Sequence, residues 1–164
     1  MKKTKISFLR LVSELENDIA ILDELMGKYN QVNHKIRHID PDEFDWASLG
    51  YTIHNIYNLL ENYFLRVSKF FENDLDHVFW HKELINRMTL EIKDIRPRLF
   101  DRKIAYKINE LRAFRHIFRY IYQSELDVIK LQDLNKKVPE MIEEFKQCHR
   151  LFIMNLHKIA SAID

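Results

Sequence analysis

Glycine and proline are nearly absent from this sequence. Its 164 residues include two glycines, Gly27 and Gly50, and three prolines, Pro41, Pro97 and Pro139. These two residue types oppose helix formation most strongly, because glycine is too flexible and proline lacks a backbone N–H. Leu, Ile, Phe, Lys and Glu are abundant. A chain with so few helix breakers is predicted to be all-α.

Apolar residues recur at a three-four spacing along most of the chain, as they do on amphipathic helices. We expect helices over about residues 4–35, 45–72, 77–92 and 101–122, followed by a C-terminal helical region after residue 127. Asp42 is suited to cap the second helix, and Pro139 to start or kink the last one. The predicted architecture is an antiparallel up-and-down bundle of about five helices, in a single domain over residues 1–164.

Composition and charge exclude several classes of protein. The net charge is +1, so any nucleic-acid binding must come from a local patch and not from a bulk positive field. Cys148 is the single cysteine, which excludes an intrachain disulfide. No uncharged apolar run approaches the ~20 residues of a membrane span, and the N-terminal segment lacks the apolar core of a signal peptide. We therefore expect a cytoplasmic protein without a membrane segment.

The sequence gives no pattern typical of a metal or cofactor site. His77 and His81 stand four residues apart, as metal ligands on a helix often do, but no third ligand follows at a recognisable spacing. No glycine-rich loop is present to hold a nucleotide. We expect neither a metal nor a cofactor, and we interpret both histidines as surface or partly buried residues.

The segment LRAFRHIFRYIY, residues 111–122, combines two helix faces. The face predicted to enter the core carries Leu111, Phe114, Ile117, Phe118 and Ile121. The other face carries Arg112, Arg115 and Arg119, with His116, Tyr120 and Tyr122 beside them. Arginine presents a rigid fork of N–H donors that suits phosphate oxygens. This cationic and aromatic face therefore predicts a phosphate-bearing partner, and its alternative is a solvated basic surface.

A second polar face lies on the helix expected over residues 45–72. His54, Asn58 and Glu61 fall together on it at i, i+4 and i+7. Taken alone, this face is interpreted as a polar surface or as a hydrogen-bond network between helices. If it meets the arginine face, Glu61 is expected to pair with an arginine and orient it, which would make these three residues a supporting layer of the site.

Several segments together resemble the HEPN superfamily of small helical bundles, and within it the HepT-like toxins. The stretch FRHIFRYIYQSELD, residues 114–127, is similar to the signature helix of that group and the turn after it. The resemblance extends to IHNIYNLLENYF, WHKELINRM and IRPRLF, and it covers about residues 45–127.

The resemblance implies a homodimer whose signature helices meet and form a composite cleft. Active members are metal-independent endoribonucleases that are commonly encoded beside a nucleotidyltransferase antitoxin. In known pairs the antitoxin transfers AMP to the tyrosine of the motif. The family pattern is an Arg, four residues, a His, one residue and a Tyr. On this chain the pattern assigns the Arg to Arg115 and the modified tyrosine to Tyr122.

This sequence departs from the family pattern at one position, because Tyr120 stands where the family has its catalytic histidine. Histidine takes up or releases a proton near neutral pH, whereas an ordinary tyrosine, with a pKa near 10, is a poor base there. His116 is the nearest histidine, but it lies about 100° around the helix from Arg115. The motif therefore predicts catalysis that is weakened or lost.

Three interpretations remain open on these grounds. The first is the toxin of a type VII-style toxin–antitoxin pair that binds RNA and acts as an endoribonuclease with a degenerate motif. Arg115, His116 and Tyr120 would then form the catalytic group, with Arg112 and Arg119 on the phosphate. The second is a non-catalytic HEPN interaction module that binds RNA, a nucleotide or a nucleotidyltransferase partner. A helical dimerisation scaffold is the third and simplest interpretation.

Overall fold

The protein is a bundle of long helices in the computed structural model, which describes residues 3–72, 80–93, 95–120 and 125–163. Its elements are α1 (Lys5–His38), α2 (Glu43–Phe71), α3 (Trp80–Met88), α4 (Arg102–Arg119) and α5 (Val128–Ser161). Within the described ranges no strand forms, and the backbone pairing of Ile92 with Arg96 is an isolated bridge. The predicted all-α class and the count of about five helices are confirmed.

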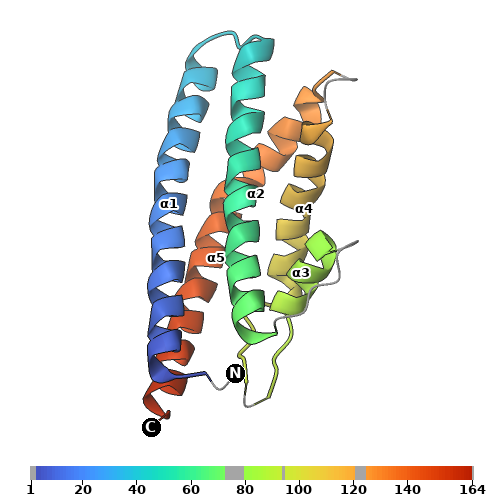
Figure 1. Ribbon diagram of the computed structural model, residues 1–164. Coiled ribbons are helices and arrows are strands. Elements are labelled where there is room, and N and C mark those ends of the chain that lie inside the picture. Colours follow the sequence, from blue (N-terminus) through green and yellow to red (C-terminus); the bar gives the residue numbers. More distant parts are fainter. Residues whose placement is uncertain (1–2, 73–79, 94, 121–124, 164) are drawn as a thin grey trace.

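The four long helices run alternately up and down (Figure 1). α1 ascends, α2 descends beside it, α4 ascends next to α2, and α5 descends behind them to the end where the chain began. The short α3 lies against α2 and α4. The shared core is formed by one apolar stripe from each long helix, including Leu15, Ile53, Ile108 and Phe145, all fully buried. This is the predicted antiparallel up-and-down arrangement.

Polar side chains immediately before the helices fix where they begin. Thr4, Asp42, Asp101 and Asp127 each accept a hydrogen bond from a backbone N–H in the first turn of the helix that follows. Such caps satisfy donors that have no partner inside the helix and stabilise it by about 1 kcal/mol each. The predicted role of Asp42 is confirmed, and α2 begins at Glu43, two residues before the expected start.

Two expected helix boundaries were wrong, and one of the two roles expected for Pro139 is excluded. α3 ends at Met88 and not near residue 92, because the chain turns back there and Leu99 donates its N–H to the Met88 carbonyl. α4 ends at Arg119 and not at residue 122, since Tyr120 leaves the helical conformation at φ −107° and ψ 14°. Pro139 does not start the last helix; it lies inside α5, where its neighbour Val138 is fully buried. Residues 77–79 and 121–122 lie outside the described ranges.

The buried face of α4 is narrower than the sequence predicted. Leu111 is fully buried and Phe114 and Phe118 are partly buried, but Ile117 is 56% exposed. Near its C-terminal end α4 packs on α2 through Phe118, and Ile117 lies about 100° around the helix from that contact. The prediction that Ile117 enters the core was therefore wrong, and Ile121 lies outside the described residues.

Gly50 sets how closely the C-terminal end of α4 approaches α2. A Cβ atom at this position would come within 2.7 Å of Cε2 of the Phe118 ring, whereas a Cβ at Gly27 would meet no atom within 4 Å. The absence of a side chain at Gly50 thus lets the Phe118 ring rest directly on the α2 backbone, which holds the last turn of α4 in place.

We predict that substitution by alanine changes stability differently at the two glycines. Gly27→Ala should raise the free energy of unfolding by about 0.5–1 kcal/mol, because alanine loses less backbone entropy in a helix. Gly50→Ala should be less stable than Gly27→Ala by at least about 1 kcal/mol, since Phe118 must move. Urea unfolding followed by circular dichroism measures both. Equal stabilisation by the two substitutions would contradict the close approach.

A buried tyrosine–histidine pair joins α2 to α5. The Tyr63 hydroxyl lies 2.9 Å from Nδ1 of His149, and the two side chains are 1% and 8% exposed. Burial lowers the pKa of His149 to about 4, with the nearby charge of Arg150 adding to the effect. The imidazole is therefore neutral in the folded protein, and its Nδ1 accepts a hydrogen bond from the tyrosine hydroxyl.

This pair makes stability depend on pH between about 4 and 6.5. In that range the unfolded chain binds a proton at residue 149 that the folded protein does not, so stability falls as the pH falls. The contribution that is lost is about 3 kcal/mol. Denaturant unfolding at pH 7, 6, 5 and 4 measures it. His149→Gln, which accepts the same hydrogen bond, should show a shallower slope; equal slopes would rule out a neutral buried His149.

Candidate functional site

One buried carboxylate contacts polar side chains from three helices. Glu61 of α2 is 5% exposed. Its Oε1 accepts hydrogen bonds from the Tyr57 hydroxyl at 3.1 Å and from Nδ1 of His81 on α3 at 2.5 Å. Its Oε2 lies 3.4 Å from Nη2 of Arg115 on α4. Glu61 is thus the point at which α2, α3 and α4 meet through polar contacts.

Arg115 is held in one orientation by α2. Its Nε donates a hydrogen bond to Oδ1 of Asn58 at 2.7 Å, and its Nη2 pairs with Glu61. The guanidinium carbon lies 5.8 Å from the centre of the Tyr57 ring, within the range of a cation–π contact. Within the described ranges Nη1 has no hydrogen-bond or ion-pair partner. The contacts with Asn58 and Glu61 therefore fix the orientation of the guanidinium through Nε and Nη2.

His54 supports Arg115 indirectly. Oδ1 of Asn58 is occupied by Arg115, so Nδ2 of Asn58 faces Nε2 of His54 at 2.9 Å and must donate to it. The imidazole ring also packs on Phe118, with 5.7 Å between ring centres. Burial lowers the pKa of His54, and the positive charges of Arg115 and Arg119 lower it further. His54 is consequently a neutral hydrogen-bond acceptor.

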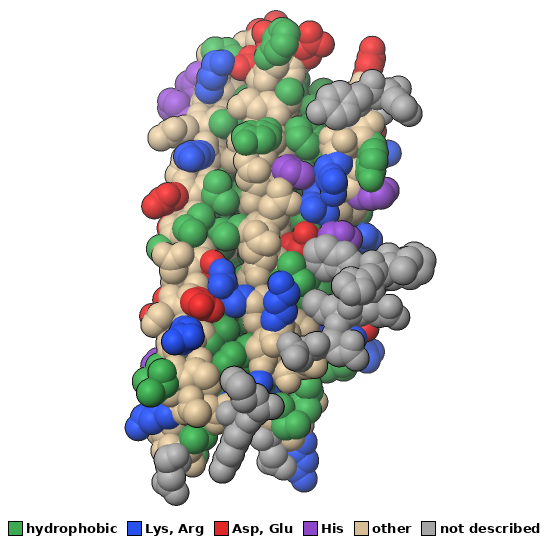
Figure 2. All heavy atoms as spheres, viewed as in Figure 1, with side chains coloured by type: hydrophobic (Ala, Val, Ile, Leu, Met, Phe, Trp, Pro, Cys, Tyr) green, Lys and Arg blue, Asp and Glu red, His purple; other side chains and the backbone are tan. Residues whose placement is uncertain are grey.

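The remaining residues of the arginine face are more exposed. Arg112 is partly buried and donates from Nε to Asn109 at 2.6 Å. Arg119, His116 and Tyr120 are exposed, and the rings of the last two lie 5.1 Å apart. Figure 2 shows basic, acidic and histidine side chains side by side along the line between α2 and α4.

The structure brings together part of the predicted site. The conditional expectation that Glu61 pairs with an arginine is met, because His54, Asn58 and Glu61 all lie along the side of α2 that faces Arg115. His116 and Tyr120 contact each other and not this group. Tyr122 lies outside the described residues. We call His54, Asn58, Glu61, His81 and Arg115 the Arg115 cluster.

His81 is the member of the cluster that the sequence did not assign to the site. It is partly buried, as expected, with 33% of its side chain exposed, but its contact with Glu61 was missed. The two residues are 20 positions apart on different helices, so no helical spacing relates them. His77 lies outside the described residues.

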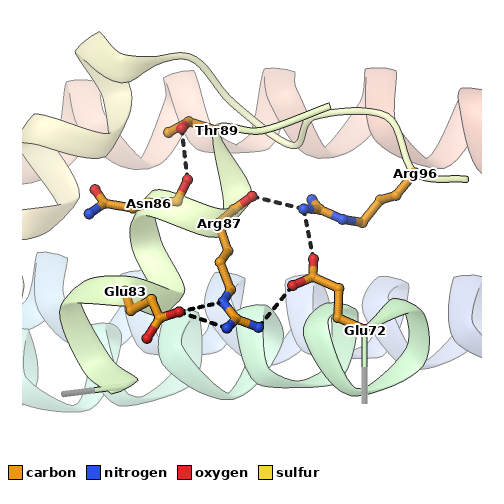
Figure 3. A network of polar contacts seen from close by, with 6 residues as sticks. All are labelled: Glu72, Glu83, Asn86, Arg87, Thr89 and Arg96. Atoms are coloured by element: carbon orange, nitrogen blue, oxygen red, sulfur yellow. Dashed lines mark hydrogen bonds and ion pairs between the residues drawn. The ribbon is translucent and has the colours of Figure 1, made fainter. Parts of the chain in front are cut away.

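A network at the other end of α3 fixes this helix against α2 (Figure 3). Arg87 of α3 pairs with Glu72 at the end of α2, and with Glu83 one turn earlier on α3. Arg96, 1% exposed, reaches back from the following segment to Glu72 at 2.9 Å and to the Arg87 carbonyl at 2.8 Å. These ion pairs hold α3 against the end of α2, and His81 lies on the same short helix.

The first groove described in the structure lies away from the Arg115 cluster. A groove of about 610 Å³ lies between residues 91–104 and the C-terminal half of α5, and its lining includes no member of the cluster. Among the described residues, no three His, Cys, Asp or Glu side chains gather as a metal site would require. The same residues form no helix that is both long and apolar enough to cross a membrane.

Comparison with known proteins identifies the family. The family model described as "HepT-like protein" matches residues 48–156, which is more than half of the chain. The chain belongs to the HepT-like protein family. No curated protein and no solved structure gave a match. The predicted membership of the HEPN superfamily is confirmed, and the matched range contains the whole Arg115 cluster.

We predict that the Arg115 cluster contributes to stability through Glu61. Glu61→Gln should lower the free energy of unfolding by about 2 kcal/mol, because Arg115 then lies partly buried without its counter-charge. Glu110→Gln is the control: its partner Lys137 is exposed, so the cost should stay below about 0.5 kcal/mol. Urea unfolding compares the two variants. Equal losses would show that Glu61 has no special role.

Proposed function

We propose that this HepT-like protein is the toxin component of a type VII-style toxin–antitoxin pair and that it binds RNA along the arginine face of α4. One observation carries the proposal. Arg115 is fixed by Asn58 and Glu61 on two sides, while its Nη1 has no partner among the described residues. A guanidinium held in this way loses little side-chain entropy when a phosphate binds.

The surroundings of Arg115 favour a long anionic chain. Arg119 lies one turn further along α4 and is exposed, and Arg112 lies one turn before Arg115. Successive guanidiniums along an open helix suit successive phosphates of a nucleic acid. Exposed Tyr120 and the partly buried His54 add rings on which unpaired bases can stack.

A specific observation favours a second candidate, the non-catalytic interaction module. Tyr120 is 62% exposed and lies just beyond the end of α4, where its ring makes a tilted contact with the ring of His116. In that position the residue that replaces the family histidine is a poor group for proton transfer. On this alternative the chain binds RNA or its partner without cleaving RNA.

The proposal includes two protein partners. A second copy of the chain would pair through α4, where Ile117 and Tyr120 expose apolar surface beside Arg119. A nucleotidyltransferase antitoxin would neutralise the toxin by modifying Tyr122, the tyrosine that the family pattern assigns to this role.

RNA binding tests the proposal. We predict that the full chain binds a single-stranded RNA of about 20 nucleotides with an affinity that falls as salt rises. Arg115→Ala should weaken binding by at least tenfold and Arg119→Ala by about threefold to tenfold, because each removes a phosphate contact. Fluorescence anisotropy at 50 and 200 mM salt measures both.

Arg102→Ala provides a matched control, since Arg102 is an exposed arginine at the opposite end of the same helix. It should bind RNA within about twofold of the wild type. If Arg102→Ala and Arg115→Ala weaken binding equally, the RNA contact is a diffuse charge effect. If the wild type does not bind RNA, the proposed function is wrong.

A further inference from the structure

A groove of about 440 Å³ lies between α3 and α4, next to the arginine face. Its lining includes Lys82, Asn86, Tyr106 and Asn109, and none of the described residues that line it is acidic. We propose that the end of this groove nearest the arginines binds one nucleotide of single-stranded RNA, with its base stacked on Tyr106. The inference rests on the proposed function, because it concerns the same RNA strand that Arg115 binds.

The antiparallel course of α3 and α4 sets which end of the groove meets the arginine face. At the start of α3, His81 contacts Glu61, and Glu61 also pairs with Arg115 near the end of α4. At the other end, the last residue of α3 accepts a hydrogen bond from the segment just before α4. Lys82, which follows His81, therefore lies at the end of the groove nearest Arg115.

Asn109 connects the groove to the arginines. Its Oδ1 accepts a hydrogen bond from Nε of Arg112 at 2.6 Å, and the same residue lines the groove. Its amide nitrogen has no hydrogen-bond partner among the described residues, so it is a donor that a base can use. Arg102 lines the far end of the groove, about 10 Å before Asn109 along α4, and lies outside this nucleotide site.

The side chains at this end of the groove suit the three parts of a nucleotide. The Tyr106 ring is 71% exposed, and every base has a face that can stack on such a ring. Lys82 is exposed and forms no ion pair within the described ranges, which suits it to a phosphate. The Asn86 amide points away from the polar network of α3 (Figure 3) and can both donate to and accept from a base edge.

Tyr106 also borders a second groove, between α4 and α5, where the charges are less favourable to RNA. In that groove Lys107 and Lys137 each pair with a glutamate, at 3.0 and 2.7 Å. Those glutamates offset the positive charge and repel phosphate. The described lining on the α3 side has no carboxylate, so a strand that leaves Arg112 is expected to follow α3.

Tyr106→Ala tests the stacking contact. We expect it to weaken binding of the RNA of about 20 nucleotides by at least about fivefold in fluorescence anisotropy, because one base loses its stacking surface. Tyr106→Phe keeps the ring and should bind within about twofold of the wild type. Lys82→Gln should weaken binding by about threefold and reduce its dependence on salt.

Phe44→Ala is the matched control, since the Phe44 ring is 73% exposed in a groove between α1 and α2. It should bind RNA within about twofold of the wild type. Crosslinking gives an independent measurement. RNA that carries 4-thiouridine, irradiated on the wild-type protein, should become attached to Tyr106 or to its neighbours on α3 and α4, as mapped by mass spectrometry.

The outcomes separate this inference from the proposed function. If Arg115→Ala weakens RNA binding but Tyr106→Ala and Lys82→Gln do not, the inference is wrong and the proposed function stands. Equal losses in Tyr106→Ala and Tyr106→Phe, or in Tyr106→Ala and Phe44→Ala, would also overturn it, because the ring or its position would then not matter. Crosslinks confined to other helices would contradict it too. Wild-type protein that does not bind RNA would overturn both proposals.

Discussion

The polar organisation of this bundle depends on the buried carboxylate of Glu61. A charge at 5% exposure is costly unless it is paired, and Glu61 meets this requirement with Tyr57, His81 and Arg115. Because those partners come from α2, α3 and α4, satisfying one buried group fixes the relative positions of three helices. The apolar core holds the four long helices together without such directional contacts.

The same requirement links the fold to the proposed chemistry. The Arg115 guanidinium that balances Glu61 is the group best placed to bind phosphate, and Asn58 and His54 complete its support. Gly50 contributes from the same helix, since it lets Phe118 approach and keeps the end of α4 near α2. Structural and functional demands therefore fall on the same side chains. Variants of the cluster have to be judged by stability and binding together.

Sequence reasoning was reliable where a single helix carried the signal. The three-four apolar spacing predicted amphipathic helices, and Phe8, Leu11 and Leu15 at this spacing on α1 are buried. Asp42 was correctly expected to cap α2. It failed where burial depended on a neighbouring helix, as at Ile117, which the periodicity placed in the core but which is exposed. Periodicity gives the direction of a side chain about its own helix, and whether another element covers that direction depends on the packing.

The sequence by itself determined the all-α class, the course of the long helices and the family, because these follow from helix propensity, apolar periodicity and local motifs. It also showed that Tyr120 replaces the histidine of the motif. Tertiary structure decided which polar faces meet. The contact between Glu61 and Arg115 spans 54 positions, and His81 enters from a separate short helix. No spacing rule relates residues on different helices, so packing alone brings this histidine to the arginine.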